Sequence, residues 1–321
     1  MTHYSIMMPF APRRPEQLLP FAALTQWSEA SCLWQGQGNV GDTHVSFSYA
    51  AASGFRVPVG TSVNLMPFLH PYDAALRAQT LAVATGHRVV AGFGPGGASL
   101  QRGTLGAPYR SQLGAVREYV TIVRSLLETG KVNHQGEFFS CGMELGTFPR
   151  PAIEIGLGVL RPRMAELAGE VADVAITWLT PASYLRDTVV PALRRGAERA
   201  GRPMPRVVAI VPMALRTPDR DPVDLALNSN SGHMRLPHYI DMLSRSGIDV
   251  DMADDPRASG RALVEGGAFL YGDQEELTQG IKEFSAAGAD EVAFNLAGVC
   301  VTYGAKTTLR ELETILGNVA R

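Results

Sequence analysis

The stretch RVVAGFGPGG, residues 88–97, joins a short apolar run to a glycine-rich turn. The apolar run predicts a buried β-strand, because strands covered on both faces read as continuous apolar segments. It is one of eight such runs, and a helical pattern separates each run from the next. The predicted strands lie near residues 4–8, 31–35, 57–65, 89–93, 153–156, 174–178, 207–215 and 291–296.

The strict alternation of strands and helices indicates parallel strands, and eight units favour a closed (β/α)8 TIM barrel over an open sheet. Helix signals support this pattern, with Pro71 in a first turn and glycines just after two helices. We therefore expect one α/β domain over residues 1–321. Two insertions interrupt the rhythm, near residues 131–150 and 217–265, and long insertions are often lids or binding loops.

The turn GFGPGG, residues 92–97, matches the dinucleotide-binding pattern G-x-G-x-x-G literally. That interpretation is disfavoured, because the convincing helix starts only after Pro108 and no acidic residue follows about twenty positions later. Two alternatives remain open. The glycines form a tight turn after a barrel strand, or they let a flat ligand approach the backbone closely.

Composition excludes several classes of function. The chain has 321 residues and a net charge of -2, with no basic run that would suggest a nucleic-acid partner. No signal peptide and no window of eighteen apolar residues is visible, so we expect a cytoplasmic protein without a membrane span. The three cysteines read as reduced thiols. No metal motif, nucleophile elbow or P-loop occurs, so an enzyme with this sequence would use a bound cofactor.

Several segments together resemble the luciferase-like monooxygenase superfamily, and more narrowly its coenzyme F420-dependent oxidoreductase branch. The resemblance covers most of the chain and is weakest in residues 217–265. Its most specific parts are LAGEVAD with TWLTP, and EYVTIVRSLL with GEFF. The segments that carry it are residues 59–81, 88–97, 109–139, 162–181 and 189–203.

The resemblance implies a cofactor at the carboxyl ends of the barrel strands, either F420 or, as the alternative, FMN. It implies a cis peptide between Ser62 and Val63, and a cofactor phosphate held by the ends of strands five and six. Arg161 and Arg163 would add positive charge there, or they are solvated arginines at a helix start. The implied cofactor-binding residues are Gln37, Ser62, Val63, Asn64, Gly94, Pro95, Gly96, Gly156, Leu157, Gly158, Arg161, Arg163, Trp178, Leu179 and Thr180.

No catalytic residue is assigned. Relatives carry a His, or in some branches a Gln, at the end of strand two, where this chain has Gln37. They often have a Glu or His after the fourth-strand glycine, where this chain has Gly96, Gly97 and Ala98. A hydride acceptor also needs a proton. The candidate donors lie in loop-like segments and are equally well explained as packing or surface residues: Tyr109, His233, His238 and Tyr239.

We expect a reductase in which reduced F420 transfers a hydride to an activated C=C or C=N bond. The small residues of GPGGASL, residues 94–100, suggest a bulky substrate, either a peptide or a natural-product intermediate of secondary metabolism. The alternatives are a monooxygenase that uses FMN and O2, and a binding protein without activity. The resemblance also implies a homodimer through the helices near strands two and three.

Overall fold

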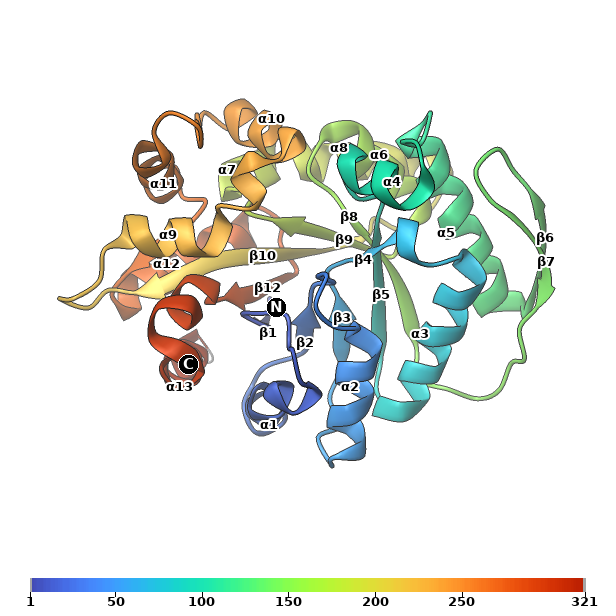
Figure 1. The fold of residues 1–321 in the computed structure, drawn as a ribbon, viewed down its shortest axis with the longest axis horizontal. Helices are drawn as coiled ribbons and strands as arrows, with labels where there is room; N and C mark the ends of the chain where they lie inside the picture. The colour runs from blue at the N-terminus through green and yellow to red at the C-terminus, as the bar shows by residue number, and fades with distance from the viewer. Residues whose placement is uncertain (1, 320–321) are drawn as a thin grey trace.

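The computed structural model describes residues 2–319 as a closed parallel barrel surrounded by helices (Figure 1). The barrel closes because β12 pairs with both β1 and β10. The predicted eight-stranded α/β barrel is therefore confirmed. Its strands are β1 (His3–Met7), β2 (Leu33–Gln35), β3 (Val59–Thr61) continued by β4 (Asn64–Leu65), β5 (Val89–Gly94), β8 (Ile153–Gly158), β9 (Val174–Trp178), β10 (Arg206–Leu215) and β12 (Glu291–Asn295).

The third barrel strand differs from the predicted continuous run over residues 57–65. It divides into β3 and β4, and the peptide between Ser62 and Val63 at this break is cis, as the resemblance implied. A further strand, β11 (Leu270–Gly272), pairs with the end of β10 and was not predicted. Three residues of ordinary composition give no period by which a sequence pattern could identify such a strand.

The helices lie where the apolar spacing places them. α3 and α5 both end at glycines with positive φ, Gly86 at +69° and Gly130 at +74°, as the stop signals predicted. The helices around the barrel are α1 (Leu19–Trp27), α2 (Thr43–Ala52), α3 (Pro71–Thr85), α4 (Ala98–Leu105), α5 (Gln112–Thr129), α6 (Pro162–Val171), α7 (Ala182–Tyr184), α8 (Val190–Ala200), α12 (Gln274–Ala286) and α13 (Ala297–Val319).

Helix α4 corrects one step of the sequence argument. It begins directly after Gly97, which is its N-cap, so the third glycine of the motif does open a helix. The dinucleotide interpretation is still disfavoured, because β5 is the fourth strand of a closed barrel and has no topological switch point beside it. A Cβ on Gly92 would overlap the Thr61 carbonyl oxygen, and Gly94 also faces protein atoms, as described below.

The first insertion forms a hairpin of β6 (Lys131–Gln135) and β7 (Ser140–Glu144), which lies outside α5 in Figure 1. The Glu118 carboxylate on α5 accepts three N–H groups at the hairpin turn, each at 2.9 Å, from residues 137–139. Tyr72 of α3 donates to the Glu144 carbonyl at 3.3 Å. The hairpin therefore packs on the outer helices.

The second insertion forms α9 (Pro222–Asn230), a 3₁₀ turn η4 (His233–Arg235), α10 (Pro237–Arg245) and α11 (Pro256–Glu265). Its middle part meets the barrel at Trp178, the last residue of β9. This insertion, unlike the hairpin, reaches the carboxyl ends of the strands. We call residues 231–246 the cap.

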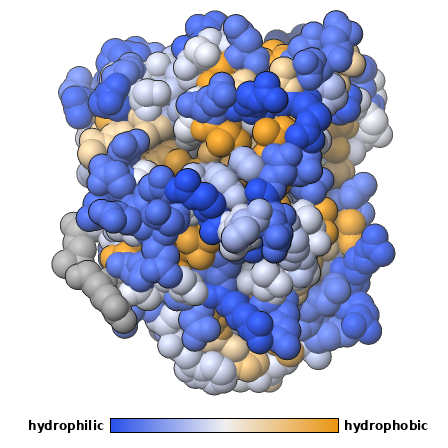
Figure 2. Space-filling model, turned by 90° about the vertical axis from the view of Figure 1, so that its left-hand side faces the viewer, coloured by the Kyte–Doolittle hydropathy of each residue, from blue (hydrophilic) through white to orange (hydrophobic). Residues whose placement is uncertain are grey.

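The core has two parts, one inside the barrel and one between the strands and the helices. At the amino end of the barrel interior, the fully buried Glu291 accepts hydrogen bonds from Ser5 and Trp34, each at 2.6 Å, and from Arg206 at 2.5 Å. Outside, the face shown in Figure 2 is mostly hydrophilic, with hydrophobic patches in its upper part. Among residues 2–319, no helix combines the length and the apolar character that a membrane crossing requires.

Candidate functional site

The residues expected to bind a cofactor gather at one end of the barrel. They lie at the ends of β2, β4, β5, β8 and β9, and the parallel register brings these ends to the same edge. Leu65 is paired with Gly94, and Gly158 with Ile176. The carboxyl end of the strands is where TIM barrels build their binding sites.

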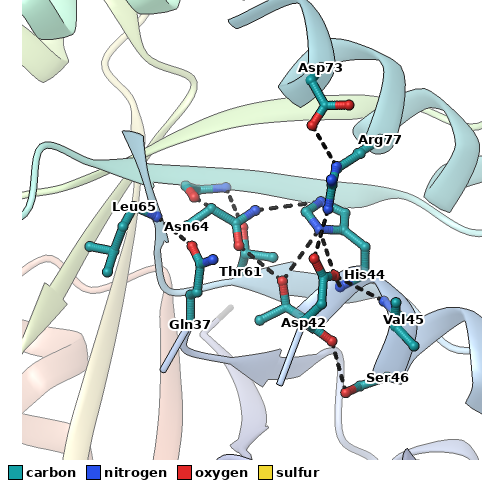
Figure 3. Close-up of polar contacts among 12 residues, drawn as sticks. Gln37, Asp42, His44, Val45, Ser46, Thr61, Asn64, Leu65, Asp73 and Arg77 are labelled. Atoms are coloured by element: carbon teal, nitrogen blue, oxygen red, sulfur yellow. Dashed lines mark hydrogen bonds and ion pairs between the residues drawn. The ribbon is translucent and has the colours of Figure 1, made fainter. Parts of the chain in front are cut away.

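The connection between β3 and β4 is held from the end of β2 (Figure 3). Ser62 N–H donates to the Gln35 carbonyl at 3.0 Å, and Gln37 N–H donates to the Val63 carbonyl at 3.4 Å. The Gln37 side-chain oxygen accepts Leu65 N–H at 2.7 Å. The side-chain oxygen of Gln37, Oε1, is therefore bound to the protein backbone. The side-chain N–H groups of Gln37 are the part that can meet a ligand.

The glycines at the ends of β5 and β8 make room for a side chain of the protein. A Cβ on Gly94 would lie 2.7 Å from Val63 Cγ2, and one on Gly158 would lie 3.4 Å from Val63 Cγ1. Val63 thus fills the space that a side chain on Gly94 would need, and a flat ligand beside this glycine stays a prediction. The glycine is required so that the connection between β3 and β4 can pack against β5.

The following turn is closed by its own helix. The Gln101 amide donates to the Pro95 and Gly96 carbonyls at 2.9 and 3.0 Å, and Gly96 has a φ of +68°. A Cβ on Gly96 would meet Leu100 at 2.5 Å, whereas a Cβ on Gly97 would find only His238 Cε1, at 3.9 Å. Of Gly94, Gly96 and Gly97, only Gly97 could carry a Cβ without a close contact.

Asn64 is buried and its side chain points toward α2 (Figure 3). Its Oδ1 accepts the Thr43 hydroxyl at 2.9 Å, and its Nδ2 lies 3.5 Å from His44 Nε2. The side chain therefore fixes β4 to the start of α2. Asn64 is a residue that supports the site from behind, and its amide is not directed to a ligand as the resemblance implied.

Asp42 holds the start of α2 and was missed by the sequence analysis. Its carboxylate accepts the N–H groups of His44 and Val45 at 2.8 and 3.1 Å and pairs with Arg77 at 2.7 Å. These contacts, above all the hydrogen bond from the His44 side chain, hold the pKa of Asp42 well below its usual range. An Asp directly before a helical pattern is an N-cap signal that could have revealed it.

The start of α6 offers backbone donors beside the ends of β8 and β9. Arg161 is the N-cap, but no side chain caps the helix, and Pro162 occupies the first turn. Pro162 has no N–H and the Met164 N–H donates to the Arg161 carbonyl at 3.1 Å, so the Arg163 N–H and the positive end of the helix dipole are what would favour an anion here. Arg163 is exposed, while Arg161 lies 3.7 Å from Asp241 of the cap, so part of its charge is already matched.

The ends of β8 and β9, the two strands beside α6, differ in the backbone groups that they could offer to a ligand. Leu179 has a φ of +56°, which is rare for a residue with a branched side chain, and the Thr180 hydroxyl donates to the Trp178 carbonyl at 3.2 Å. Gly156 and Leu157 lie inside β8, where strand pairing with β5 and β9 uses the backbone. Gly158 is the residue at the strand end, and the role of Gly156 and Leu157 in binding a phosphate stays a prediction.

Three of the four candidate proton donors reach the barrel mouth. His233 stacks on Trp178 at 5.1 Å, and Tyr239 and His238 lie next to it. Tyr109 instead packs against Phe138 and Phe139 of the hairpin. Burial, helped by His238, lowers the pKa of His233 to about 4, so its imidazole is neutral at pH 7 and cannot act as a strong acid there.

The site suits an organic group with hydrogen-bond acceptors and negative charge. Trp178 Nε1 and the Tyr184 hydroxyl are buried without a partner among residues 2–319, and donors left in this way are suited to a ligand acceptor. Together with the uncapped start of α6, they fit a cofactor that carries a phosphate. In the same residues, no group of three or more His, Cys, Asp or Glu side chains could hold a metal ion.

Two curated relatives act with F420 or on a pterin, according to their names. The chain is 32% identical over 191 residues to an F420-dependent glucose-6-phosphate dehydrogenase of Nakamurella multipartita, covering 56% of this chain and 55% of that one. It is 28% identical over 246 residues to a 5,10-methylenetetrahydromethanopterin reductase of Methanolobus tindarius, covering 72% and 70%. The match thus spans about half of the length of the first relative.

The fold agrees with that of a solved structure, the F420-dependent tetrahydromethanopterin reductase of Methanopyrus kandleri. The two superpose with a TM-score of 0.74 at 19% identity, over 99% of this chain and 97% of the other. The family model for luciferase-like monooxygenases matches residues 10–291, which include the ends of β2, β4, β5, β8 and β9 that form the candidate site. The barrel, its strand-end site and this match together show that the chain belongs to the luciferase-like monooxygenase family.

Proposed function

We propose that the protein is an F420-dependent reductase that acts on an activated C=C or C=N bond of a bulky organic substrate. The observation that carries the proposal is the uncapped start of α6 beside Gly158 and Thr180, which favours an anion at the barrel edge. The similarity to a relative named as an F420-dependent dehydrogenase supports the choice of cofactor. FMN carries a phosphate too, so a monooxygenase that uses FMN is the alternative outcome of the test below.

The residues that would hold the cofactor divide into two groups. Gly158, Thr180 and Arg163 lie beside the start of α6 and would bind the phosphate. Gln37 and the backbone of the β3–β4 connection would contact the ring system through the Gln37 amide and peptide groups. When bound, reduced F420 supplies a hydride.

After hydride transfer, the reaction still needs a proton. The acceptor bond gains the hydride and then a proton, so it is reduced by two electrons while F420 is oxidised. His233 is neutral at pH 7, and Tyr239 holds its proton tightly because burial raises its pKa. We therefore assign the proton to water.

A bulky substrate, such as a peptide or a natural-product intermediate, is consistent with the site. Gly97 presents no side chain to the barrel mouth, and the nearest atom to a Cβ there belongs to His238 of the cap. A substrate larger than a simple alcohol would extend from the strand ends toward Gly97 and the cap.

We also propose a homodimer through α2 and α3, which pack side by side. Val45 and Tyr49 on α2 are 59% and 41% exposed, and Leu76 and Val83 on α3 are 40% and 48% exposed. Four large apolar side chains on two adjacent helices form a surface that a second copy would cover.

Cofactor choice is tested by titrating the protein with F420 and, separately, with FMN, and by following cofactor fluorescence. Binding of F420 with weaker binding of FMN supports the proposal, whereas binding of FMN alone overturns it. Arg163→Gln should weaken F420 binding about tenfold, because it removes a charge that the phosphate meets. Arg195→Gln, an exposed arginine on α8, is the matched control and should bind F420 like the wild type.

A further inference from the structure

The cap meets the barrel through a stack of three aromatic rings, which we call the aromatic stack: Trp178, His233 and Tyr239. The His233 ring lies 5.1 Å from the Trp178 ring with 34° between their planes. Tyr239 meets His233 edge-on, at 4.9 Å and 62°. Tilted and edge-on arrangements of this kind are the favoured geometries of aromatic pairs.

The aromatic stack stands at the same barrel edge as the cofactor residues. Trp178 is the last residue of β9, and its side chain packs against the inner barrel cluster that also contains Met7 and Ile176. Val63 of the β3–β4 connection packs against the same cluster. The aromatic stack therefore lies beside the expected cofactor site, where a bound substrate could contact it.

The aromatic stack is electrically neutral near pH 7. Burial lowers the pKa of both His233 and His238. The pKa of His233 is lowered further by His238, and that of His238 by Arg161. Of the arginines beside the cap, Arg161 and Arg245 both pair with Asp241, at 3.7 and 3.0 Å. Arg235 of the cap is exposed to solvent, so the neutral rings of the stack are what a phosphate placed against them would meet in exchange for its hydration, which is unfavourable.

We propose that the aromatic stack selects the substrate, and that it binds a planar, uncharged conjugated group, with His233 and Tyr239 as specificity-determining residues. This inference deepens the proposed function and rests on it. Flat aromatic faces bind flat conjugated groups through dispersion and complementary ring electrostatics. The imidazole of His233 thus contributes a planar surface.

The cap also offers apolar surface beyond the aromatic stack. Leu236 and Ile240 are 38% and 37% exposed, and their spacing of four places them on one side of the start of α10. His238 lies between them in the sequence and faces Gly97. The apolar part of a bulky substrate would lie along this side of the cap while its planar group contacts the aromatic stack.

The test uses three probes in calorimetric titrations of the whole protein. Menadione is planar, uncharged and has a conjugated C=C bond; cyclohex-2-en-1-one has the same reactive group without the aromatic plane; glucose 6-phosphate carries a dianion. We expect menadione to bind at least about tenfold more tightly than the other two. Equal or tighter binding of glucose 6-phosphate, or no measurable binding of menadione, overturns the proposal.

Variants assign the effect to the ring of His233. His233→Leu keeps the size but removes the plane, and should weaken menadione binding about fivefold, whereas His233→Phe should retain it. His87→Leu changes an exposed histidine outside the cap and is the matched control. Unchanged binding in the His233→Leu protein, with an unchanged thermal unfolding temperature, contradicts the role of the stack.

These titrations need no cofactor, so the two proposals fail separately. Binding of FMN alone, together with the expected menadione pattern, would overturn the F420 assignment and leave the substrate class supported. Normal F420 binding with no preference for menadione would support the F420 assignment and overturn the substrate class. Titrations of the His233→Phe protein with menadione and with cyclohex-2-en-1-one then show whether the preference follows the planar ring. An equal gain in affinity for both compounds would contradict selection by the aromatic stack.

Discussion

The side chain of Val63 occupies the space in front of Gly94: a Cβ on Gly94 would lie 2.7 Å from Val63 Cγ2. The glycine at the end of β5 and the valine of the β3–β4 connection are therefore matched to each other. A turn that looks like a ligand-binding motif is, at this position, a contact within the protein.

Gly94→Ala should consequently destabilise the protein by about 1–3 kcal/mol, the usual cost of overpacking a filled site. It should also weaken cofactor binding, because Val63 and the connection that carries it must shift. Thermal unfolding and F420 titration measure the two effects. Gly103→Ala is the matched control, since a Cβ there meets no atom within 4 Å and alanine favours the helix.

The buried carboxylate of Glu291 gives a prediction about stability alone. Glu291→Gln removes the charge that Arg206 meets inside the barrel and should cost about 3 kcal/mol in the free energy of unfolding. Chemical denaturation measures this cost. Glu128→Gln, whose partner Arg124 sits one turn away on α5 near the surface, should change stability by less than about 1 kcal/mol. Similar losses in both variants would contradict the prediction.

His233 makes stability depend on pH. Its pKa is about 4 in the folded protein, below the ordinary value of 6.5, so the unfolded chain binds a proton between these pH values and the folded one does not. Stability should therefore fall as the pH drops from 6.5 to 4, by up to about 3 kcal/mol from this residue. The unfolding temperature of the His233→Phe protein should depend less on pH in this window; parallel curves for the two proteins would argue against it.

The exposed apolar side chains of α2 and α3 predict the effect of charge on assembly. Val45→Glu combined with Leu76→Glu should convert the proposed dimer into a monomer, because two buried charges would face a second copy across the interface. Light scattering after size-exclusion chromatography measures the mass. Val301→Glu, at a 64% exposed position on α13, should leave the mass unchanged. A wild-type monomer at all concentrations would overturn the dimer.

Arg161 gives a prediction about the cap. Its ion pair with Asp241 joins the start of α6 to α10, so Asp241→Asn should free the arginine for a phosphate and strengthen F420 binding, by about twofold to fivefold. Fluorescence titration measures the change. Asp187→Asn removes an exposed carboxylate that pairs with its neighbour Arg186 and should have no effect. Weaker binding in the Asp241→Asn protein would show that the pair helps to form the site.

Much of the fold could be predicted because it depends on local patterns. Continuous apolar runs such as residues 88–94 have only one stable arrangement, a strand covered on both faces, and glycines such as Gly86 and Gly130 end helices by their own geometry. The start of α4 was missed because Gly97 and Gly103 weaken the helical pattern, although packing after β5 is enough to form the helix.

The sequence by itself thus determined the closed barrel, the strand order and the edge at which the site lies, since these follow from periodicity and parallel pairing. Only the tertiary structure decided which neighbours each site residue has. Val63 fills the space at Gly94, Asn64 faces α2, and His233 stacks on Trp178 although 55 positions separate them in the sequence. Such contacts depend on where side chains from distant segments meet, and no local pattern along the chain encodes that.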